Sequence, residues 1–246
     1  MQRLRKTNST SAYQRLISLA ICWLCLANSA PLLAEHDFTP FTATYTVSRN
    51  DTEIGIRTHQ LSQQDGQYLY KANMHTVGLA RFFKPGEVTE KSQWQLKNKK
   101  IVPVSYEYND SSDKERHTLL KFDWPNNSVT NHVGKKPWMM DIPEGTQDKF
   151  GYMITLMHDL QHGKKNPEYK IADGGRLKTY QFKTLKTELI ETPFGSFETL
   201  KLQRTRVGKK NRITYLWCLP EKNYLPIKIE RHKGGNVYTM LLNQLK

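Results

Sequence analysis

Residues 147–161, QDKFGYMITLMHDLQ, form the one stretch of this sequence whose apolar residues recur convincingly at helical spacing. The repeating apolar positions are Phe150, Met153, Ile154, Met157 and Leu160. Thr146 or Asp148 is suited to cap the start of a helix here, and Gly163 is suited to end it. We therefore predict one amphipathic helix over about 147–161 that lays its apolar stripe on a sheet.

On both sides of this helix, apolar and polar residues alternate as they do in β-strands. In 41–49, FTATYTVSR, every second residue from Phe41 to Val47 is apolar. Turn signals such as Asn50-Asp51, Asp173-Gly174-Gly175 and Gly234-Gly235 separate about twelve such segments. An open sheet with so many strands is expected to curl. The prediction is a mainly β fold, a strongly curved antiparallel sheet or incomplete β-barrel around the helix, in one domain over residues 35–246.

The first 34 residues have the features of an export signal. A basic start is followed by the apolar run Leu16–Leu26, then by the small residues at 27–30 and by Ala34. Cleavage after Ser29 or after Ala34 fits the small-residue rule, and a retained signal anchor is the alternative. No later apolar run is long enough to span a membrane as a helix. The sequence therefore predicts a periplasmic protein whose mature chain, from about Glu35, has no transmembrane span.

The charge of the chain favours an anionic partner. The sequence holds 37 Lys and Arg against 23 Asp and Glu, and the segment 1–34 accounts for four of the basic residues and no acid, so the mature chain keeps about +10. For an exported protein, this excess favours lipid headgroups or acidic polymers over nucleic acid. A basic surface with no dedicated partner is the alternative. Cys218 is the one cysteine after residue 34, so we expect no internal disulfide.

No motif in the sequence announces catalysis, a metal or a cofactor. His158 and His162 have the spacing of a zinc-binding helix, but Gly163 ends the helix there and no third ligand follows. We expect these two side chains to point toward solvent, away from the apolar stripe. Ser196 lacks the second glycine of a nucleophile elbow, and Cys218 lies in a β run as a buried thiol would. We therefore predict no catalytic residue, no metal ligand and no cofactor.

The segment Gly78–Gly86, GLARFFKPG, interrupts the strand pattern with an apolar loop. Adjacent rings at Phe82 and Phe83 cannot both point the same way along an extended chain. The loop is expected either to plug the end of the sheet or to form a lid or membrane-touching tip beside Arg81 and Lys84.

A space left between the helix and the sheet would suit a hydrophobic or lipid-like ligand. The residues that would line this site come from the loop, the strands and the helix: Phe82, Phe83, Trp94, Tyr106, Tyr108, Met153, Met157 and Trp217. The alternative is that the aromatic residues simply fill the core.

Several segments resemble a known family. They are Phe41-x-Ala43-x-Tyr45 with Ile54-Gly55, then 103–108, 122–124, Gln147-Asp148, 195–201 and 217–229. On these segments, nearly the whole mature chain resembles DUF3108, a family of exported bacterial proteins of unknown function. The resemblance implies an exported β-rich fold and no particular chemistry. The family is similar in layout to the LolA/LolB-type periplasmic lipoprotein carriers, which wrap a curved sheet around helices and hold acyl chains.

The sequence thus predicts a non-enzymatic envelope protein of the periplasm, with a lipid-like ligand in the concavity of its sheet or an anionic membrane surface as its partner. A basic interaction or structural module without a cavity is the first alternative, and a hydrolase with dispersed catalytic residues is the second. A cavity lined by Met153, Met157 and strand aromatics would favour ligand binding. A filled core would favour the interaction module, and carboxylates or His in a cleft would favour the hydrolase.

Overall fold

The computed structural model describes residues 38–83, 85–113, 116–133 and 136–246. The chain divides into Met1–Phe38, of which only Phe38 is described, and the unit Thr39–Lys246. The predicted export signal, with both of its cleavage sites, lies outside the described residues.

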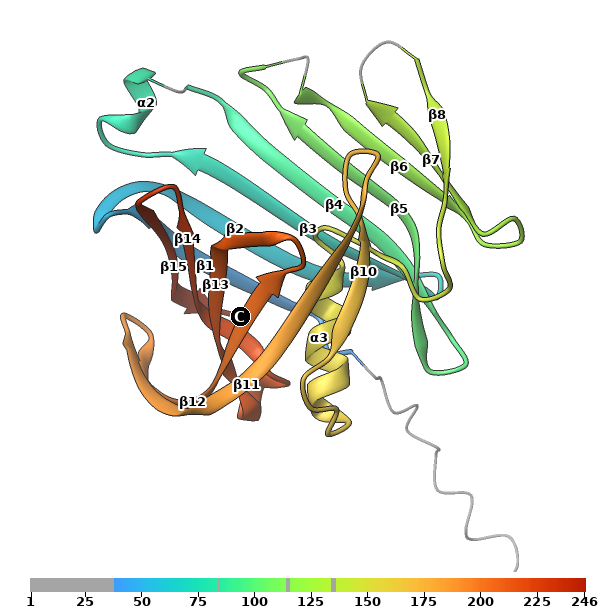
Figure 1. Cartoon of the computed structure of the whole chain (residues 1–246). Coiled ribbons are helices and arrows are strands. Elements are labelled where there is room, and N and C mark those ends of the chain that lie inside the picture. Colours follow the sequence, from blue (N-terminus) through green and yellow to red (C-terminus); the bar gives the residue numbers. More distant parts are fainter. Residues whose placement is uncertain (1–37, 84, 114–115, 134–135) are drawn as a thin grey trace, which may run out of the picture. The chain divides into compact units, whose positions relative to one another are not determined.

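One sheet of fifteen strands makes up most of the unit Thr39–Lys246 (Figure 1). The strands are β1 Phe41–Arg49, β2 Thr52–Gln64, β3 Gln67–Thr76, β4 Glu87–Lys97, β5 Lys100–Asp110, β6 Thr118–Asp123, β7 Ser128–Val133, β8 Trp138–Asp141, β9 Gln147–Asp148, β10 Glu168–Ala172, β11 Leu177–Thr192, β12 Gly195–Arg206, β13 Lys209–Leu219, β14 Leu225–Lys233 and β15 Asn236–Leu245. Their order is β8-β7-β6-β5-β4-β3-β2-β1-β15-β14-β13-β12-β11-β10-β9, and neighbours are antiparallel except β9 and β10. Two meanders, β1–β8 and β10–β15, are therefore joined where β1 pairs with β15.

Tight turns connect the strands where the sequence predicted them. Residues 50 and 51, 174 and 175, and 234 and 235 all have positive φ at both positions. This is the geometry of type I′ turns, whose twist matches that of the flanking strands and which Asn, Asp and Gly tolerate best. The antiparallel meander is thus encoded locally, turn by turn.

The predicted helix is confirmed as α3 (Tyr152–Gln161), on the concave side of the sheet (Figure 1). We call the sheet surface toward α3 the inner face; there the ring of Phe150, just before the helix, stacks on Tyr70 of β3 at 4.2 Å. The five residues of the predicted stripe are buried together with two neighbours: Phe150, Tyr152, Met153, Ile154, Leu156, Met157 and Leu160. Apolar burial on this face therefore joins the helix to the curved sheet, as predicted.

The helix begins five residues later than predicted. Gln147 and Asp148 form the short strand β9, which pairs in parallel with Ile171 and Ala172 of β10. Backbone groups used in this ladder are not available to a helix, and the helix starts only after a turn at Asp148. A second short helix, α2 (Ala80–Phe83), lies within the segment predicted as a loop.

The two ends of the sheet approach each other without closing into a continuous ladder. From β9, the Gln147 side chain donates a hydrogen bond of 3.2 Å to the carbonyl of Ile101 in β5. At the β10–β11 turn, the Gly175 amide donates to Asn131 Oδ1 of β7 at 3.0 Å. A Cβ at Gly175 would lie 1.7 Å from the ring of Trp138 in β8, so only glycine fits this approach. The architecture is the predicted incomplete barrel, bridged across its opening by side chains.

We predict that Met157→Asp lowers the free energy of unfolding by about 3 kcal/mol or more, because it buries a charge in an apolar contact. Met157 is 5% exposed, whereas Gln161 on the same helix is exposed. Gln161→Asp is the matched control and should cost less than about 1 kcal/mol. Urea denaturation measures both variants; equal and small losses would contradict the docking of α3.

Candidate functional site

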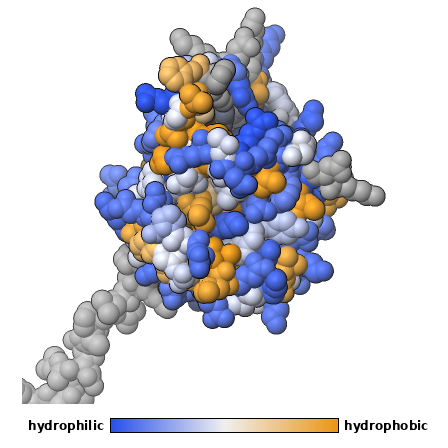
Figure 2. Space-filling model, turned by 90° about the vertical axis from the view of Figure 1, so that its left-hand side faces the viewer, coloured by the Kyte–Doolittle hydropathy of each residue, from blue (hydrophilic) through white to orange (hydrophobic). Residues whose placement is uncertain are grey.

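The segment predicted as a lid or tip carries large apolar side chains in solvent. Leu79 is 77% exposed and Phe82 is 83% exposed, beside the exposed Arg81. The side chain of Phe83 and the whole of Lys84 lie outside the described part of the chain. Figure 2 shows hydrophobic residues at the upper end of one face, with strongly hydrophilic residues next to them. Leu79, Ala80, Arg81 and Phe82 form a protruding tip, which we call the α2 tip.

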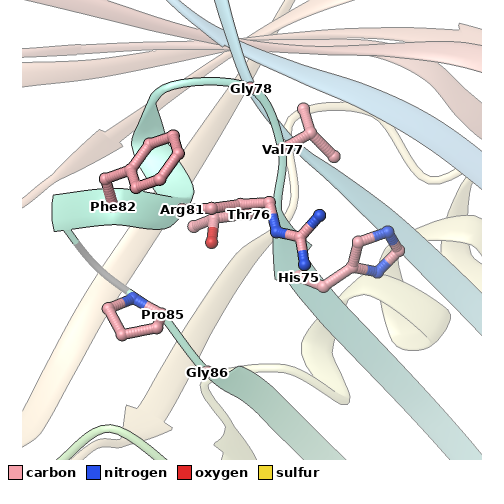
Figure 3. Close-up of a pocket in the computed structure, with 8 residues that line it drawn as sticks. All are labelled: His75, Thr76, Val77, Gly78, Arg81, Phe82, Pro85 and Gly86. Atoms are coloured by element: carbon pink, nitrogen blue, oxygen red, sulfur yellow. The ribbon is translucent and has the colours of Figure 1, made fainter.

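A hollow of about 950 Å³, open to solvent, lies beneath the α2 tip (Figure 3). Its lining comes from the end of β3, from α2 and from the chain leading into β4: His75, Thr76, Val77, Gly78, Arg81, Phe82, Pro85 and Gly86. In Figure 3 the Arg81 side chain reaches from α2 toward His75, whereas the Phe82 ring points in a different direction. The hollow therefore combines a cationic side with an apolar rim.

Three of the predicted lining residues share the inner face of β4 and β5. Trp94 and Tyr106 are each 1% exposed, and Tyr108 is half-buried. The Trp94 ring stacks on Tyr68 at 4.1 Å, and Lys149 Nζ lies 4.4 Å from the centre of the Tyr108 ring. The helix residues Met153 and Met157 are buried as well. Three of these five residues thus lie on the inner face of the sheet, and the other two are buried on α3.

Trp217 lies on the other face of the sheet. It pairs with Lys201, next to the pair of Leu216 and Leu202, whose side chains are on the inner face. The Nζ atoms of Lys201 and Lys228 lie 4.7 and 4.5 Å from the centre of the Trp217 ring. Strand alternation therefore separates Trp217 from the other predicted lining residues.

The carboxylate of Glu188 fixes the Trp217 ring from the side. Trp217 Nε1 donates to Glu188 Oε2 at 2.6 Å, and Lys186 and Lys201 also contact this carboxylate. Hydrogen bonds from Trp217 and Lys186 lower the pKa of Glu188 to about 2. The Glu188 carboxylate is therefore ionised at neutral pH. The cluster ties β11 to β13 on the outer face, where Trp217 is 4% exposed.

A polar network that the sequence did not announce links the inner face to the start of α3. Glu90 of β4 forms an ion pair with Arg57 of β2 and accepts a hydrogen bond of 2.8 Å from the Tyr106 hydroxyl. Lys149 Nζ lies 3.8 Å from the same carboxylate. Burial raises the pKa of Glu90, but the charges of Arg57 and Lys149 outweigh it, so the pKa is lowered. The carboxylate is therefore held in its charged form.

His59 extends this network into the core. Arg57 Nε donates to His59 Nε2 at 2.8 Å, so the proton of the neutral ring is assigned to Nδ1, which lies 2.7 Å from the Tyr70 hydroxyl. Burial and the charge of Arg57 hold the pKa of His59 well below its usual value. The rings of Tyr45, Tyr70 and Phe150 surround it. The arrangement is a buried hydrogen-bond chain that runs from Arg57 through His59 to Tyr70.

Asp148 ties the sheet to the start of the helix. Its carboxylate has no exposed surface and accepts hydrogen bonds from Ser92 Oγ at 2.6 Å and from the amides of Phe150 and Gly151 at 2.8 and 2.6 Å. A Cβ at Gly151 would lie 2.3 Å from Ser92 Oγ. Burial raises the pKa of Asp148 to about 6 despite these three donors. Ser92 and Asp148 are both 0% exposed, so their hydrogen bond is a buried contact between β4 and the start of α3.

The expectation that His158 and His162 both point toward solvent was wrong for His158. His158 is 9% exposed, because the buried surface of α3 is wider than the predicted stripe, whereas His162 is exposed. His162 Nδ1 lies 2.8 Å from the backbone oxygen of His158. Within the described ranges, no three His, Cys, Asp or Glu side chains are placed to hold a metal ion. Cys218 is buried as predicted, and burial raises the pKa of its thiol.

These features define a class of protein: a mainly β protein whose curved, unclosed sheet wraps one docked helix. The chain belongs to the family described as "Protein of unknown function (DUF3108)", whose profile matches residues 42–242. Among curated proteins, none matches the sequence. In the part of the chain that the structure describes, neither helix has the length and apolarity needed to cross a bilayer.

Three solved structures are similar to this chain at low sequence identity. A β-barrel-like protein of the domain of unknown function DUF1849 from Brucella abortus is 11% identical, with a TM-score of 0.58 over 84% of this chain and 97% of that chain. A "putative lipoprotein" from Parabacteroides distasonis is 13% identical, with a TM-score of 0.36 over 85% and 96% of the two chains. A "putative exported protein with YmcC-like fold" from Bacteroides fragilis is 10% identical, with a TM-score of 0.32 over 84% and 94%. The first similarity confirms the β-barrel-like fold.

We predict that Asp148 makes stability depend on pH. Its pKa in the folded protein, about 6, exceeds the ordinary value of 3.8, so the folded state binds this proton more tightly than the unfolded state. The contribution of Asp148 to the free energy of unfolding is therefore most favourable below about pH 4. It falls by up to about 3 kcal/mol as the pH rises through 6. Asp148→Asn cannot ionise and should remove this fall. Urea denaturation between about pH 4 and 7 compares the two proteins, and parallel profiles would refute the assignment.

Proposed function

We propose that the protein is a non-enzymatic protein of the cell envelope, exported to the periplasm, that docks on anionic lipid through the α2 tip. The observation that carries this proposal is the exposure of Leu79 and Phe82, at 77% and 83%, next to the cationic Arg81. Full burial of such a side chain is worth about 1.5–3 kcal/mol. Two of them held in solvent on one protruding turn favour a partner that covers them.

A lipid surface suits the chemistry of the α2 tip. Apolar side chains on a short helix can enter the boundary between headgroups and acyl chains, while a guanidinium meets the headgroup phosphates. The predicted mature chain carries a net charge of about +10, which draws it to an anionic surface over a distance of about a Debye length. Arg81 lines the hollow beneath the tip, where it is placed to hold a headgroup.

In this proposal, the predicted lining residues divide into two groups. Phe82 belongs to the contact with lipid, and the side chain of Phe83, the next residue, lies outside the described part of the chain. Four others belong to the packed interior on the inner face of the sheet and on α3: Trp94, Tyr106, Met153 and Met157 are each at most 8% exposed. Tyr108 and Trp217 are covered by lysine side chains and belong to neither contact.

The double variant Leu79→Ser/Phe82→Ser should bind vesicles of phosphatidylglycerol and phosphatidylcholine at least tenfold more weakly than the natural protein. The reason is the loss of two apolar insertions, each worth more than about 1.4 kcal/mol. Vesicle co-sedimentation measures the affinity, and circular dichroism checks the fold. Vesicles of phosphatidylcholine alone should bind the natural protein weakly.

The matched control is Met139→Ser/Leu189→Ser, which removes two apolar side chains that are 72% and 68% exposed on β8 and β11. This control should bind anionic vesicles as the natural protein does. If the natural protein has no affinity for anionic vesicles, or if the tip variant binds as tightly as the control, the α2 tip is not a lipid contact.

A further inference from the structure

A second pocket, away from the α2 tip, is lined mainly by cations. Its volume is about 80 Å³, whereas a single water needs only about 10–15 Å³. The lining residues come from β11 to β14 and from the turn before β11: Asp173, Lys178, Tyr180, Arg204, Arg206, Arg212, Thr214 and Arg231. Five cations thus surround a space large enough for a small oxyanion, with one carboxylate among them.

The register of four neighbouring strands brings these side chains together. Arg204 of β12 pairs with Thr214 of β13, and Thr214 pairs with Arg231 of β14. Arg206 of β12 pairs with Tyr180 of β11. Residues paired across strands point to the same face, and Arg204 contacts Tyr152 of α3, so this is the inner face. The pocket therefore lies on the inner face, beside the start of the helix.

Arg204 is held in place at the base of the pocket. Its Nη1 donates to the Tyr152 hydroxyl, and its Nη2 donates to Thr214 Oγ1 at 2.8 Å. Its Cζ lies 4.5 Å from the centre of the Tyr180 ring. A guanidinium fixed in this way loses little freedom when it binds a ligand. The one carboxylate of the pocket, Asp173, is already paired with Lys178.

Among the described residues, most of the remaining cations of the pocket have no carboxylate partner. Arg206, Arg212 and Arg231 form no ion pair with any residue that the structure describes. Burial, followed by the charge of Arg206, lowers the pKa of Lys178 to about 8. Burial and the charge of Arg204 also lower the pKa of Arg231. Like charges held this close repel one another, and a multivalent anion between them would remove that cost.

We propose that this pocket binds a phosphate group. Several guanidinium groups converge on one small space, and the planar fork of arginine matches the oxygens of phosphate with paired hydrogen bonds. The phosphate comes either from a free phosphate ion or from a lipid headgroup; the chemistry recognised is the same. This inference goes beyond docking at the α2 tip, because none of the pocket residues belongs to the tip.

Isothermal titration calorimetry with two probes, inorganic phosphate and a water-soluble short-chain phosphatidic acid, tests the proposal. Arg212→Gln/Arg231→Gln removes two of the cations without an ion pair and should weaken binding at least tenfold. Lys97→Gln/Lys183→Gln removes the same charge from two exposed positions that do not line the pocket and should leave the affinity within about twofold. Circular dichroism confirms that both variants fold.

Binding of inorganic phosphate that the arginine variant loses and the lysine variant keeps supports a site for the free ion. The same pattern with phosphatidic acid alone supports a site for a lipid headgroup. If neither probe binds the natural protein, or if both double variants behave alike, the pocket is not a phosphate site. The variant Leu79→Ser/Phe82→Ser should keep its affinity for inorganic phosphate. The phosphate site and the docking of the α2 tip on lipid can therefore be refuted separately.

Discussion

The buried carboxylate of Asp148 is the constraint on which the arrangement of helix and sheet depends. An unpaired carboxylate without solvent is costly, so its three donors must all stay in place. One donor is Ser92 in β4, and the other two are the amides that lead into α3. The absence of a side chain at Gly151 lets the helix start close against this pair. The position of α3 on the sheet is thus set by hydrogen bonds as well as by apolar burial.

Charged side chains from both halves of the sheet lie near the start of α3. On one side, Glu90 of β4 faces Arg57 and Lys149 and is neutralised by them. On the other side, the Tyr152 hydroxyl contacts Arg204, which lines the second pocket. In that pocket the positive side chains outnumber the single carboxylate. The apolar stripe of α3 runs away from this polar end. The fold therefore separates a packed apolar core, which stabilises it, from a basic region that is free to recognise an anion.

Local patterns in the sequence predicted the helix and the turns. The start of the helix and the inner face of β2 depend on pairing with strands that are distant in the sequence. The stripe of α3 and the glycine turns could be predicted because spacing and φ preference act within a few residues. The late start of the helix could not be predicted, because Gln147 and Asp148 pair with Ile171 and Ala172 of β10, which are distant in the sequence. In β2, Ile54 and Ile56 are apolar at alternate positions, yet the inner face carries Arg57 and His59. Their polar partners lie on β3 and β4.

The cationic pocket was unpredictable for the same reason, since its arginines lie on three strands that only the register aligns.

Native-state hydrogen exchange tests the claim that Asp148 fixes the helix. We expect the amides of Phe150 and Gly151 to exchange only through global unfolding, with the same opening free energy as Ile154 in α3. If those two amides exchange as fast as exposed loop amides while Ile154 stays protected, the helix is held without Asp148, which would contradict this claim.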